Sequence, residues 1–326
     1  MAVGLGAAAV AFCVAFFVPW LPTNASKEGH RIDVVFWVVS IICIGIFALV
    51  ASVILYAIVR FRARPDDDSD GAPIHGHTGL EIVWTAVPAV LVTVISVVSA
   101  VALAENDHLP KKHMVVDVTA QQFAWSFKYP SYKNLTSPDL RLILNEPTQL
   151  KLRSLDVIHS FWVPEFRQKQ DAVPGITTRV VVTPTKLGTY PLICTELCGL
   201  GHAVMRTQAI VMRRSAFTAW RKAQQKALAP GAGGAGKAAF LTNGCGGCHT
   251  FKPAGSVGHT GPDLDKLAAY ARRAHKPLAA FIRESIVKPS AYVEPGFADV
   301  MPKTFGQLPK SQIDALVKYL MKGAKS

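Results

Sequence analysis

The stretch C-T-E-L-C-G-L-G-H-A-V-M at residues 194–205 is the most informative part of the chain. Its twelve residues hold two thiols, an imidazole and a thioether, a soft donor set that suits copper or zinc better than magnesium or calcium. A second imidazole, His159, lies upstream in D-V-I-H-S-F-W-V-P (156–164), on a predicted strand that a rigid sandwich can bring to the loop. A mononuclear blue-copper site needs one thiolate and two histidines, so the second thiolate indicates two copper ions bridged by sulfur. The candidate ligands are His159, Cys194, Cys198, His202 and Met205.

Each of these residue types also has an interpretation without metal. A cysteine pair in an extracytoplasmic domain can form a disulfide. His159 alone could be a hydrogen-bonded core histidine, and Met205 alone could fill a core. The convergence of two cysteines, two histidines and a methionine favours a metal site over packing. Cys13 and Cys43 lie in long apolar stretches, where we expect small buried side chains without chemistry.

Upstream of the loop, apolar residues alternate with polar or small ones, which is the period of a β-strand. The clearest run carries Phe123, Trp125, Phe127 and Tyr129. Proline and glycine separate the runs, and several short strands at this spacing predict an all-β sandwich of about 100 residues within 107–227. The predicted strands begin at Met114 and continue over 123–129, 141–145, 148–153, 157–163, 178–183 and 209–212.

Three apolar stretches precede the sandwich, and a membrane-spanning helix needs about 20 apolar residues. Residues 2–21 have no charge, and both a signal peptide and a retained extra helix fit the segment 1–26. Residues 34–59 and 80–103 are long enough to span, so we expect a transmembrane helical hairpin over 27–106. Arginines in the connection between them favour its position on the inside, which places all later residues outside.

Composition and charge exclude several classes of protein. With 50% apolar and 17% charged residues, the 326-residue chain is not intrinsically disordered. Its net charge of +13 divides into −2, +8 and +7 over residues 1–104, 105–230 and 231–326. No dense basic block or groove-reading motif is present, so we expect no nucleic-acid partner. The two positive regions repel each other on average, so any contact between them must depend on local patches or apolar surface.

A second cysteine pair lies in C-G-G-C-H, residues 245–249, the signature of covalent c-type haem attachment. Cys245 and Cys248 would bind the porphyrin and His249 the iron, with a disulfide as the alternative for the pair. Met301 has a spacing suited to a sixth ligand, and His/Met ligation raises the haem potential. The weaker rivals for the sixth position are Met321, His259 and His275.

The segment 228–236 is rich in alanine and glycine and predicts a flexible linker. The domain after it, 237–326, is expected to be small and all-α. Its first helix is predicted over 237–242 and its last over 311–322, with Ser311 as the N-cap.

Three motifs, L-E-I-V-W-T-A-V-P (80–88), 156–164 and 194–205, resemble in this order subunit II of the haem-copper cytochrome c oxidases, in the variety with a fused cytochrome c domain. The resemblance implies a cupredoxin sandwich with a binuclear copper A centre. In that centre Cys194 and Cys198 would bridge the coppers, His159 and His202 would each bind one, Met205 would be a weak ligand, and Glu196 would offer its backbone carbonyl. The Glu196 carboxylate would face a magnesium site shared with subunit I.

The resemblance also implies roles for two residues that have structural alternatives. Trp125 matches the aromatic segment where electrons enter, and it is equally one of four alternating core aromatics. Glu81 resembles a glutamate at the mouth of a proton-uptake path, and Thr78 followed by Glu81 is also a capping box at a helix start. In the haem domain, the resemblance extends to Gly236, Phe240 and Tyr319 as packing residues of the terminal helices, and to Gly261-Pro262 as the loop that supports the proximal histidine.

The function implied is electron entry into a respiratory oxidase. Electrons would pass from an external cytochrome c or other donor to haem c, to the copper pair, and to the oxygen-reducing, proton-pumping subunit I. The expected partners are the other oxidase subunits and membrane lipid, and the expected location is the bacterial cell membrane with both soluble domains on the extracytoplasmic side. A subunit of a membrane nitric oxide reductase and a copper-delivery protein are the alternatives.

Overall fold

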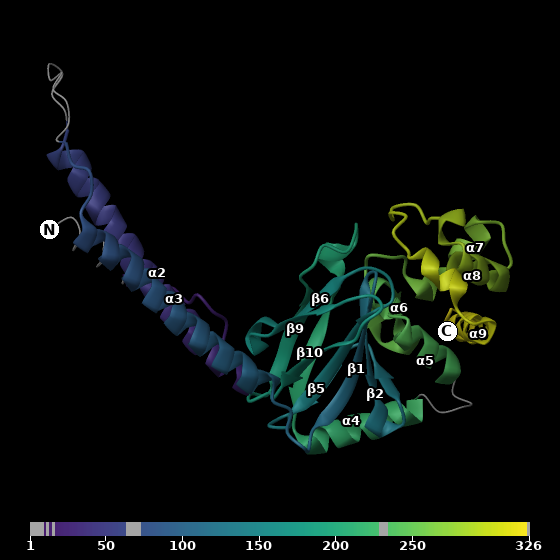
Figure 1. Ribbon diagram of the computed structural model, residues 1–326. Coiled ribbons are helices and arrows are strands. Elements are labelled where there is room, and N and C mark those ends of the chain that lie inside the picture. Colours follow the sequence, from purple (N-terminus) through teal and green to yellow (C-terminus); the bar gives the residue numbers. More distant parts are fainter. Residues whose placement is uncertain (1–9, 11–12, 15–16, 63–72, 228–233, 325–326) are drawn as a thin grey trace. The chain divides into compact units, whose positions relative to one another are not determined.

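The computed structural model describes residues 10, 13–14, 17–62, 73–227 and 234–324 (Figure 1). The described residues form two compact units. One unit contains two long helices, and the other contains the described residues from Leu109 onward together with Ala25–Glu28. Three predictions fall largely outside the described residues: the nature of segment 1–26, the position of the arginine-containing connection between the helices, and most of the linker 228–236.

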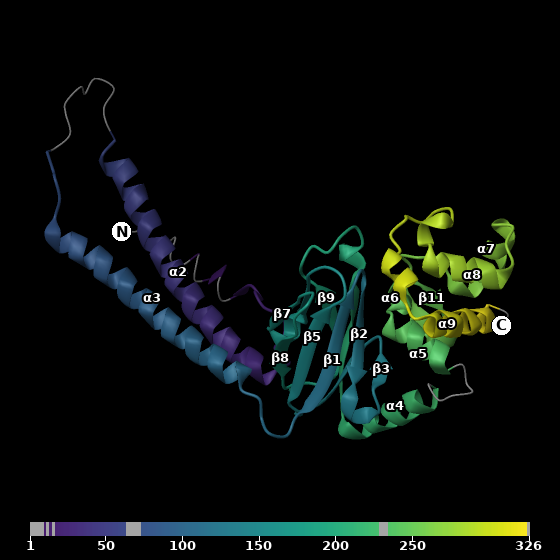
Figure 2. The same ribbon diagram turned by 45° about the vertical axis from the view of Figure 1, so that its right-hand side comes forward.

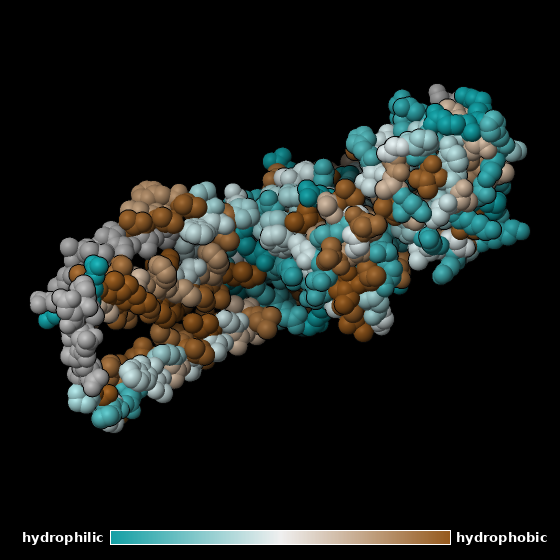
Figure 3. Space-filling view, turned by 90° about the horizontal axis from the view of Figure 1, so that it is seen from above, coloured by the Kyte–Doolittle hydropathy of each residue, from teal (hydrophilic) through white to brown (hydrophobic). Residues whose placement is uncertain are grey.

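The first unit is a hairpin of α2 (Lys27–Arg60) and α3 (Thr78–Asp107) (Figure 2). With 34 and 30 residues, each helix is longer than the hydrocarbon core of a bilayer, about 30 Å. The helices are antiparallel, because Arg31 near the start of α2 pairs with Glu105 near the end of α3. The most apolar part of each helix is unburied, and Figure 3 shows apolar side chains gathered over the hairpin. The predicted hairpin is confirmed, and its exposed surface suits lipid.

The start of α3 differs by one residue from the predicted capping box. The N-cap is His77, whose ring Nδ1 accepts a hydrogen bond from the Leu80 N–H at 3.1 Å. Glu81 Oε1 accepts from the His77 backbone N–H at 3.2 Å, which completes a reciprocal pair of bonds. The prediction of Thr78 as the cap was wrong, because the imidazole nitrogen takes the role expected of the hydroxyl and Thr78 is already helical.

The second unit begins with a sandwich of two five-stranded sheets, in the orders β3-β2-β1-β5-β8 and β4-β10-β9-β6-β7 (Figure 1). The pairs β1–β5 and β4–β10 are parallel, and the other neighbours are antiparallel. The strands are β1 (Met114–Gln121), β2 (Ala124–Tyr129), β3 (Leu135–Ser137), β4 (Leu140–Ile143), β5 (Thr148–Ser154), β6 (His159–Trp162), β7 (Lys169–Ala172), β8 (Thr178–Val182), β9 (Gly188–Cys194) and β10 (Arg206–Met212).

The alternating pattern of the sequence becomes the core of this sandwich. Val116 and Val118 of β1 are fully buried and pair with Leu150 and Leu152 of β5. The aromatic run that ends at Tyr129 is buried throughout. Each fully buried aliphatic or aromatic side chain contributes about 1.5–3 kcal/mol, so a one-residue slip of register would be costly.

The prediction omitted three strands and one helix of this domain. β3 and β7 have only three and four residues, too few to show a period. β9 contains Pro191 and begins at Gly188, both of which weaken a strand prediction. Helix α4 (Arg214–Ala227) follows β10 and buries Phe217, whose ring centroid lies 6.0 Å from that of Tyr129.

The remainder of the second unit is mainly helical, as predicted, with one added two-stranded sheet. Its elements are α5 (Gly234–Thr242), α6 (Cys245–Cys248), β11 (Thr250–Phe251), β12 (Ser256–Val257), α7 (Leu267–Arg273), α8 (Leu278–Val287) and α9 (Lys310–Gly323). Helices α7 and α8 were not predicted.

The predicted packing of the two terminal helices is confirmed. A Cβ on Gly236 of α5 would lie 2.3 Å from the Ala315 carbonyl oxygen of α9, so the close approach requires glycine. The rings of Phe240 and Tyr319 lie 6.0 Å apart between centroids. The prediction of Ser311 as the N-cap was wrong, because α9 begins at Lys310 and its N-cap position is Pro309.

Candidate metal centre and haem site

Two antiparallel strands position the first candidate ligands. His159 is the first residue of β6, and Cys194 is the last residue of β9. The strands pair with Phe161 opposite Cys194, so backbone hydrogen bonds set the distance between the histidine and the cysteine. The loop from β9 to β10 supplies the remaining candidates, and it returns to the sheet at Met205, whose carbonyl accepts from the Cys194 N–H at 3.1 Å.

The structure brings all five predicted side-chain ligands together. The Sγ atoms of Cys194 and Cys198 are 3.9 Å apart. Cys194 Sγ lies 3.9 Å from His159 Nδ1, whereas Cys198 Sγ lies 3.6 Å from His202 Nδ1 and 3.7 Å from Met205 Sδ. The Glu196 carbonyl oxygen lies 3.3 Å from Cys194 Sγ, and the Glu196 side chain is exposed. Each cysteine therefore has its own histidine.

These residues fit a soft metal. A disulfide needs a sulfur–sulfur distance of about 2.05 Å, so at 3.9 Å the two cysteines are free thiols. Thiolate sulfur bonds such metals at about 2.3 Å, and two sulfurs at the observed separation can both reach one ion. His159, Cys194 and Cys198 are all buried, with ligand atoms within 4.8 Å of one another. Thiolate, imidazole and thioether are the donors that copper prefers, so the composition of this cluster suits copper.

The pKa values of the two thiols point the same way. Burial opposes ionisation of Cys194, but hydrogen bonds with His159 and with the backbone outweigh it and lower its pKa to about 7. At Cys198, burial and the neighbouring Cys194 thiolate raise the pKa to about 12. Two thiolates this close repel, so the pair ionises in two separate steps. A cation held between the sulfurs would stabilise both negative charges at neutral pH.

Asp156 orients His159, a role that sequence reasoning did not assign although it quoted the residue in the same motif. The Oδ1 atom of Asp156 lies 2.8 Å from His159 Nε2, which leaves Nδ1 directed at Cys194. Burial lowers the pKa of His159, but the hydrogen bonds and charges of Asp156 and Cys194 together outweigh burial and raise this pKa. Burial likewise raises the pKa of Asp156, and hydrogen bonds from His159 and from the Gln122 and Val157 N–H groups bring it below its usual range. Asp156 is thus an ionised partner of a buried ligand.

We expect Asp156→Asn to weaken copper binding by about 10- to 100-fold, the usual cost of losing an outer-shell partner of a histidine ligand. The neutral amide has one acceptor oxygen for the four groups that bond the carboxylate: the His159 ring, the Gln122 and Val157 N–H groups and the Ser154 hydroxyl. Competition titration of the purified chain against a copper chelator measures the change. Asp139→Asn is the matched control, since Asp139 lies in the same domain and bonds Thr207 and Arg141 instead. Equal affinities of the two variants would contradict the orienting role.

Trp125 lies in the core beside the candidate metal ligands. Its ring centroid is 6.2 Å from that of His159 and 5.9 Å from that of Phe161, and only 3% of the residue is exposed. Its indole N–H has no hydrogen-bond partner among the described residues. Trp125 therefore occupies the core position that its alternation predicted, and it also adjoins a candidate ligand. Glu81 lies in the other unit, exposed in the first turn of α3, with its carboxylate on the helix cap.

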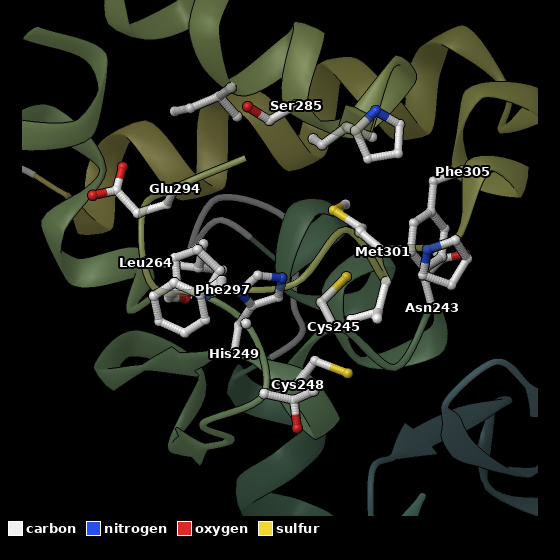
Figure 4. A pocket seen from close by; sticks show the side chains of 18 of the residues that line it. Asn243, Cys245, Cys248, His249, Leu264, Ser285, Glu294, Phe297, Met301 and Phe305 are labelled. Atoms are coloured by element: carbon white, nitrogen blue, oxygen red, sulfur yellow. Dashed lines mark hydrogen bonds between the residues drawn. The ribbon is translucent and has the colours of Figure 1, made fainter. Parts of the chain in front are cut away.

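The second cysteine pair forms one wall of a large cavity (Figure 4). The space between its lining residues, counted together with its open mouth, is about 1300 Å³. Figure 4 shows the side chains of Cys245, His249 and Met301 directed into this space. Apolar side chains provide most of the lining, among them Leu264, Leu267, Phe281, Ile282, Ile286 and Leu316. A large flat apolar group with two thiols at its edge fits this space, as a covalently attached porphyrin requires.

His249 is prepared to bind iron through one nitrogen. Its Nδ1–H donates to the Pro262 carbonyl at 2.7 Å, which leaves Nε2 as the free ligand atom. Burial lowers the pKa of His249 in spite of this bond, so the neutral imidazole that metals bind is favoured. Gly261, next to Pro262, donates its N–H to the Cys248 carbonyl at 2.8 Å. The predicted support of the histidine by this loop agrees with these contacts.

We expect Gly261→Ala to displace His249, because the new Cβ would lie 2.5 Å from the imidazole Cε1. The purified variant should lose the low-spin haem absorption spectrum. Gly255→Ala is the control, since its new Cβ meets open space while its φ of +70° imposes backbone strain of roughly 1–2 kcal/mol. A low-spin spectrum in Gly261→Ala as strong as in the control would show that the loop does not confine the ring.

Met301 is the candidate sixth ligand that lies in the cavity wall. Its three rivals are not among the residues that line it: Met321 packs in the core of the domain from α9, and His259 and His275 lie in loops. The geometry therefore favours Met301 over Met321, His259 and His275, and its ligand role stays a prediction.

Fold and sites together define a membrane-anchored protein that joins a cupredoxin-like β-sandwich with a thiolate-rich metal loop to a helical cytochrome c domain. Family models match in the same order: the transmembrane domain of cytochrome c oxidase subunit II over residues 15–101, its periplasmic domain over 134–213, and cytochrome c over 234–324. The chain belongs to the cytochrome c oxidase subunit II family. It is thus a membrane-anchored subunit of an oxidoreductase with an extracytoplasmic domain.

Individual relatives agree with this assignment. Cytochrome c oxidase subunit 2 of Thermostichus vulcanus is 34% identical over 66% of this chain and 82% of that protein. The subunit of the same name from Alkalihalophilus pseudofirmus is 29% identical over 87% of this chain and 84% of its own length. Among solved structures, the periplasmic domain of subunit II of cytochrome oxidase from Bradyrhizobium japonicum is 26% identical and covers 37% of this chain and all of that chain, with a TM-score of 0.36.

Proposed function

We propose that this chain accepts electrons from an external cytochrome c or similar donor and delivers them, through a covalently bound haem c and a binuclear copper A centre, to subunit I of an oxygen-reducing, proton-pumping oxidase. The observation that carries the proposal is the cluster of two facing thiols, each with its own imidazole, built on paired strands. When bound, copper and haem supply one-electron transfer. The bacterial source of the named relatives favours the bacterial cell membrane as the location.

The protein's contribution is rigidity. Backbone pairing of β6 with β9 holds His159 and Cys194, and the hydrogen bond from Asp156 holds the imidazole ring. Ligands fixed in this way need little rearrangement when the charge of the metal changes, which is what fast electron transfer requires. The same rigidity speaks against a copper-delivery function, because delivery needs ligands that can be opened.

Glu196 and the net charge suggest two further contacts. The Glu196 side chain is exposed beside the metal loop, where its carboxylate could bind magnesium together with subunit I. The positive charge of both soluble domains suits an acidic donor or anionic lipid.

The test is an absorption and paramagnetic-resonance spectrum of the purified full chain, with metal quantification. We expect a low-spin c-type haem together with a mixed-valence copper pair. A colourless chain would overturn the proposal. Oxygen consumption against nitric oxide consumption by the copurified complex separates an oxidase from a nitric oxide reductase.

A further inference from the structure

Met301 lies in a segment of irregular backbone, residues 292–302, which we call the methionine segment. Phe297, Val300 and Met301 of this segment line the haem cavity. The Phe297 N–H donates to the Glu294 carbonyl at 3.1 Å, a bond that stays within the segment. Irregular backbone has no ladder of hydrogen bonds to neighbouring elements, so such a segment opens more easily than a helix or strand unless side chains hold it.

Glu294 is a buried acid in the methionine segment. Only 6% of the residue is exposed, and burying a carboxylate without partners is costly. The Tyr292 hydroxyl donates to Glu294 Oε2 at 2.9 Å, and the Arg273 guanidinium forms an ion pair with Oε1. Figure 4 shows the Glu294 carboxylate turned away from His249 and Met301. The carboxylate is therefore bound by side chains of the protein and is not placed as an iron ligand.

The partners of Glu294 connect the methionine segment to two helices of the haem domain. Arg273 is the last residue of α7, and its guanidinium carbon lies 5.9 Å from the centre of the Tyr270 ring on the same helix. The Tyr292 ring packs edge-on against Phe281 of α8, with 5.3 Å between ring centroids. Tyr270, Phe281 and Tyr292 all line the haem cavity. One cluster of side chains therefore joins α7, α8 and the methionine segment at the cavity wall.

A second side-chain bond joins the methionine segment to the residues before it. The Ser290 hydroxyl donates to Asp299 Oδ1 at 3.1 Å. Both residues are exposed, so water competes for this bond and its net contribution is small. The Glu294 carboxylate is nearly inaccessible to water, although its partner Arg273 is half exposed. Breaking the ion pair leaves a buried charge without its counter-ion, so Glu294 holds the segment more firmly than Asp299 does.

We propose that Arg273, Tyr292 and Glu294 form a latch that keeps the methionine segment closed over the haem cavity. The closed latch holds Met301 at the iron and keeps small external ligands out. All three residues are positioning residues, since they act on the iron only through Met301. The inference deepens the proposed function and rests on it, because it requires a bound haem c. Opening of the latch would move Met301 away and let a small donor molecule enter the cavity.

The test is imidazole binding by the purified full chain with ferric haem, followed by absorption. The methionine sulfur leaves the iron as the imidazole nitrogen binds, and the iron stays ferric. The apparent affinity for imidazole therefore rises with the fraction of chains in which the segment is open. We expect Arg273→Met to bind imidazole about ten- to a hundredfold more tightly, the equivalent of one hydrogen bond to a charged group.

Two further variants and a control surround this measurement. Glu294→Gln removes the ion pair without leaving a buried charge, so we expect a smaller rise of about two- to tenfold. Arg273→Lys keeps the charge and should lie between the unmodified chain and Arg273→Met. Asp314→Asn is the matched control, because it removes the exposed ion pair with Arg283, and neither residue of that pair lines the cavity. Its imidazole affinity should equal that of the unmodified chain.

A second measurement does not depend on the iron. Hydrogen exchange of the backbone N–H groups in residues 292–302, followed by mass spectrometry, reports opening of the segment directly. We expect faster exchange there in Arg273→Met, a smaller increase in Glu294→Gln, and no change in Asp314→Asn. Haem content and thermal unfolding of each variant separate local opening from loss of the fold.

Met301→Leu sets the upper limit of imidazole affinity, because it has no sulfur to displace. An affinity in Met301→Leu equal to that of the unmodified chain would overturn the latch. Unchanged affinity and unchanged exchange in both Arg273→Met and Glu294→Gln, with the haem spectrum intact, would also overturn it. Both of these results leave the proposed function standing. Absence of a c-type haem spectrum in the unmodified chain would instead remove the proposed function, and the latch with it.

Discussion

His159→Ala is expected to eliminate copper binding while leaving the haem spectrum intact. His159 is fully buried, and its Nδ1 faces Cys194. Alanine at this position offers no ligand atom and removes the imidazole that bonds Asp156. Since losing an outer-shell partner already costs about 10- to 100-fold in metal affinity, we expect more than about 100-fold from losing the ligand itself. Copper per chain, haem per chain and the paramagnetic-resonance signal measure the outcome.

His113→Ala controls for the general effect of removing a histidine from this domain. Its ring Nδ1 contacts the Pro110 carbonyl at the start of the sandwich and lies in no metal cluster among the described residues. Thermal unfolding of both variants separates a folding defect from a binding defect. Full copper content in folded His159→Ala protein would contradict the ligand assignment.

Local spacing explains why the clustering of the candidate copper ligands could be predicted from the sequence. Cys194, Cys198, His202 and Met205 lie within one loop, so their proximity needs no knowledge of the fold. His159 was reachable because a strand prediction placed it on a rigid element. The partners of Asp156 were not, since its bond to Gln122 joins residues 34 apart in sequence. Such contacts depend on how strands pair, which periodicity does not specify.

The alternation of apolar and polar residues also does not determine which site each apolar side chain faces. The sequence predicts that Phe123 and Trp125 belong to one alternating run, but only the hairpin decides that Trp125 faces the core beside His159 while Phe123 lines the haem cavity. The resemblance pointed to Trp125 as the residue of electron entry. The geometry adds Phe123, whose ring lies against the metal loop at Gly201 and also lines the haem cavity.

Helix caps and short helices were the weakest predictions because several residue types can fill one role. His77 caps α3 where a threonine was expected, and α9 begins after a proline with no side-chain cap at all. Helices α7 and α8 are only 7 and 10 residues long. Their apolar residues line the haem cavity, and this role cannot be read from so short a pattern. The composition of a cavity wall follows from tertiary packing, which a single sequence reveals poorly.

Met301→Leu is expected to lower the haem reduction potential and abolish the sixth ligand without releasing the haem. In the proposed function, thioether bonds from Cys245 and Cys248 would hold the porphyrin covalently, so haem content should stay constant. Axial ligands set haem potentials over a range of about 0.8 V, and methionine lies on the high side, so we expect a fall on the order of 0.1 V or more. Leucine keeps the volume nearly constant, which confines the change to the donor atom. Redox titration and the absorption spectrum measure both effects.

Met321→Leu is the matched control, because Met321 is a thioether of the same domain that packs in its core from α9 and does not line the cavity. Its potential should equal that of the unmodified chain. A potential that falls in Met321→Leu and not in Met301→Leu would transfer the ligand role to α9. The consequence for electron flow is directional: a haem of lower potential donates more readily to copper but accepts less readily from an external donor. Met301→Leu should therefore slow reduction by the donor while haem-to-copper transfer is maintained, and the opposite pattern would contradict His/Met ligation.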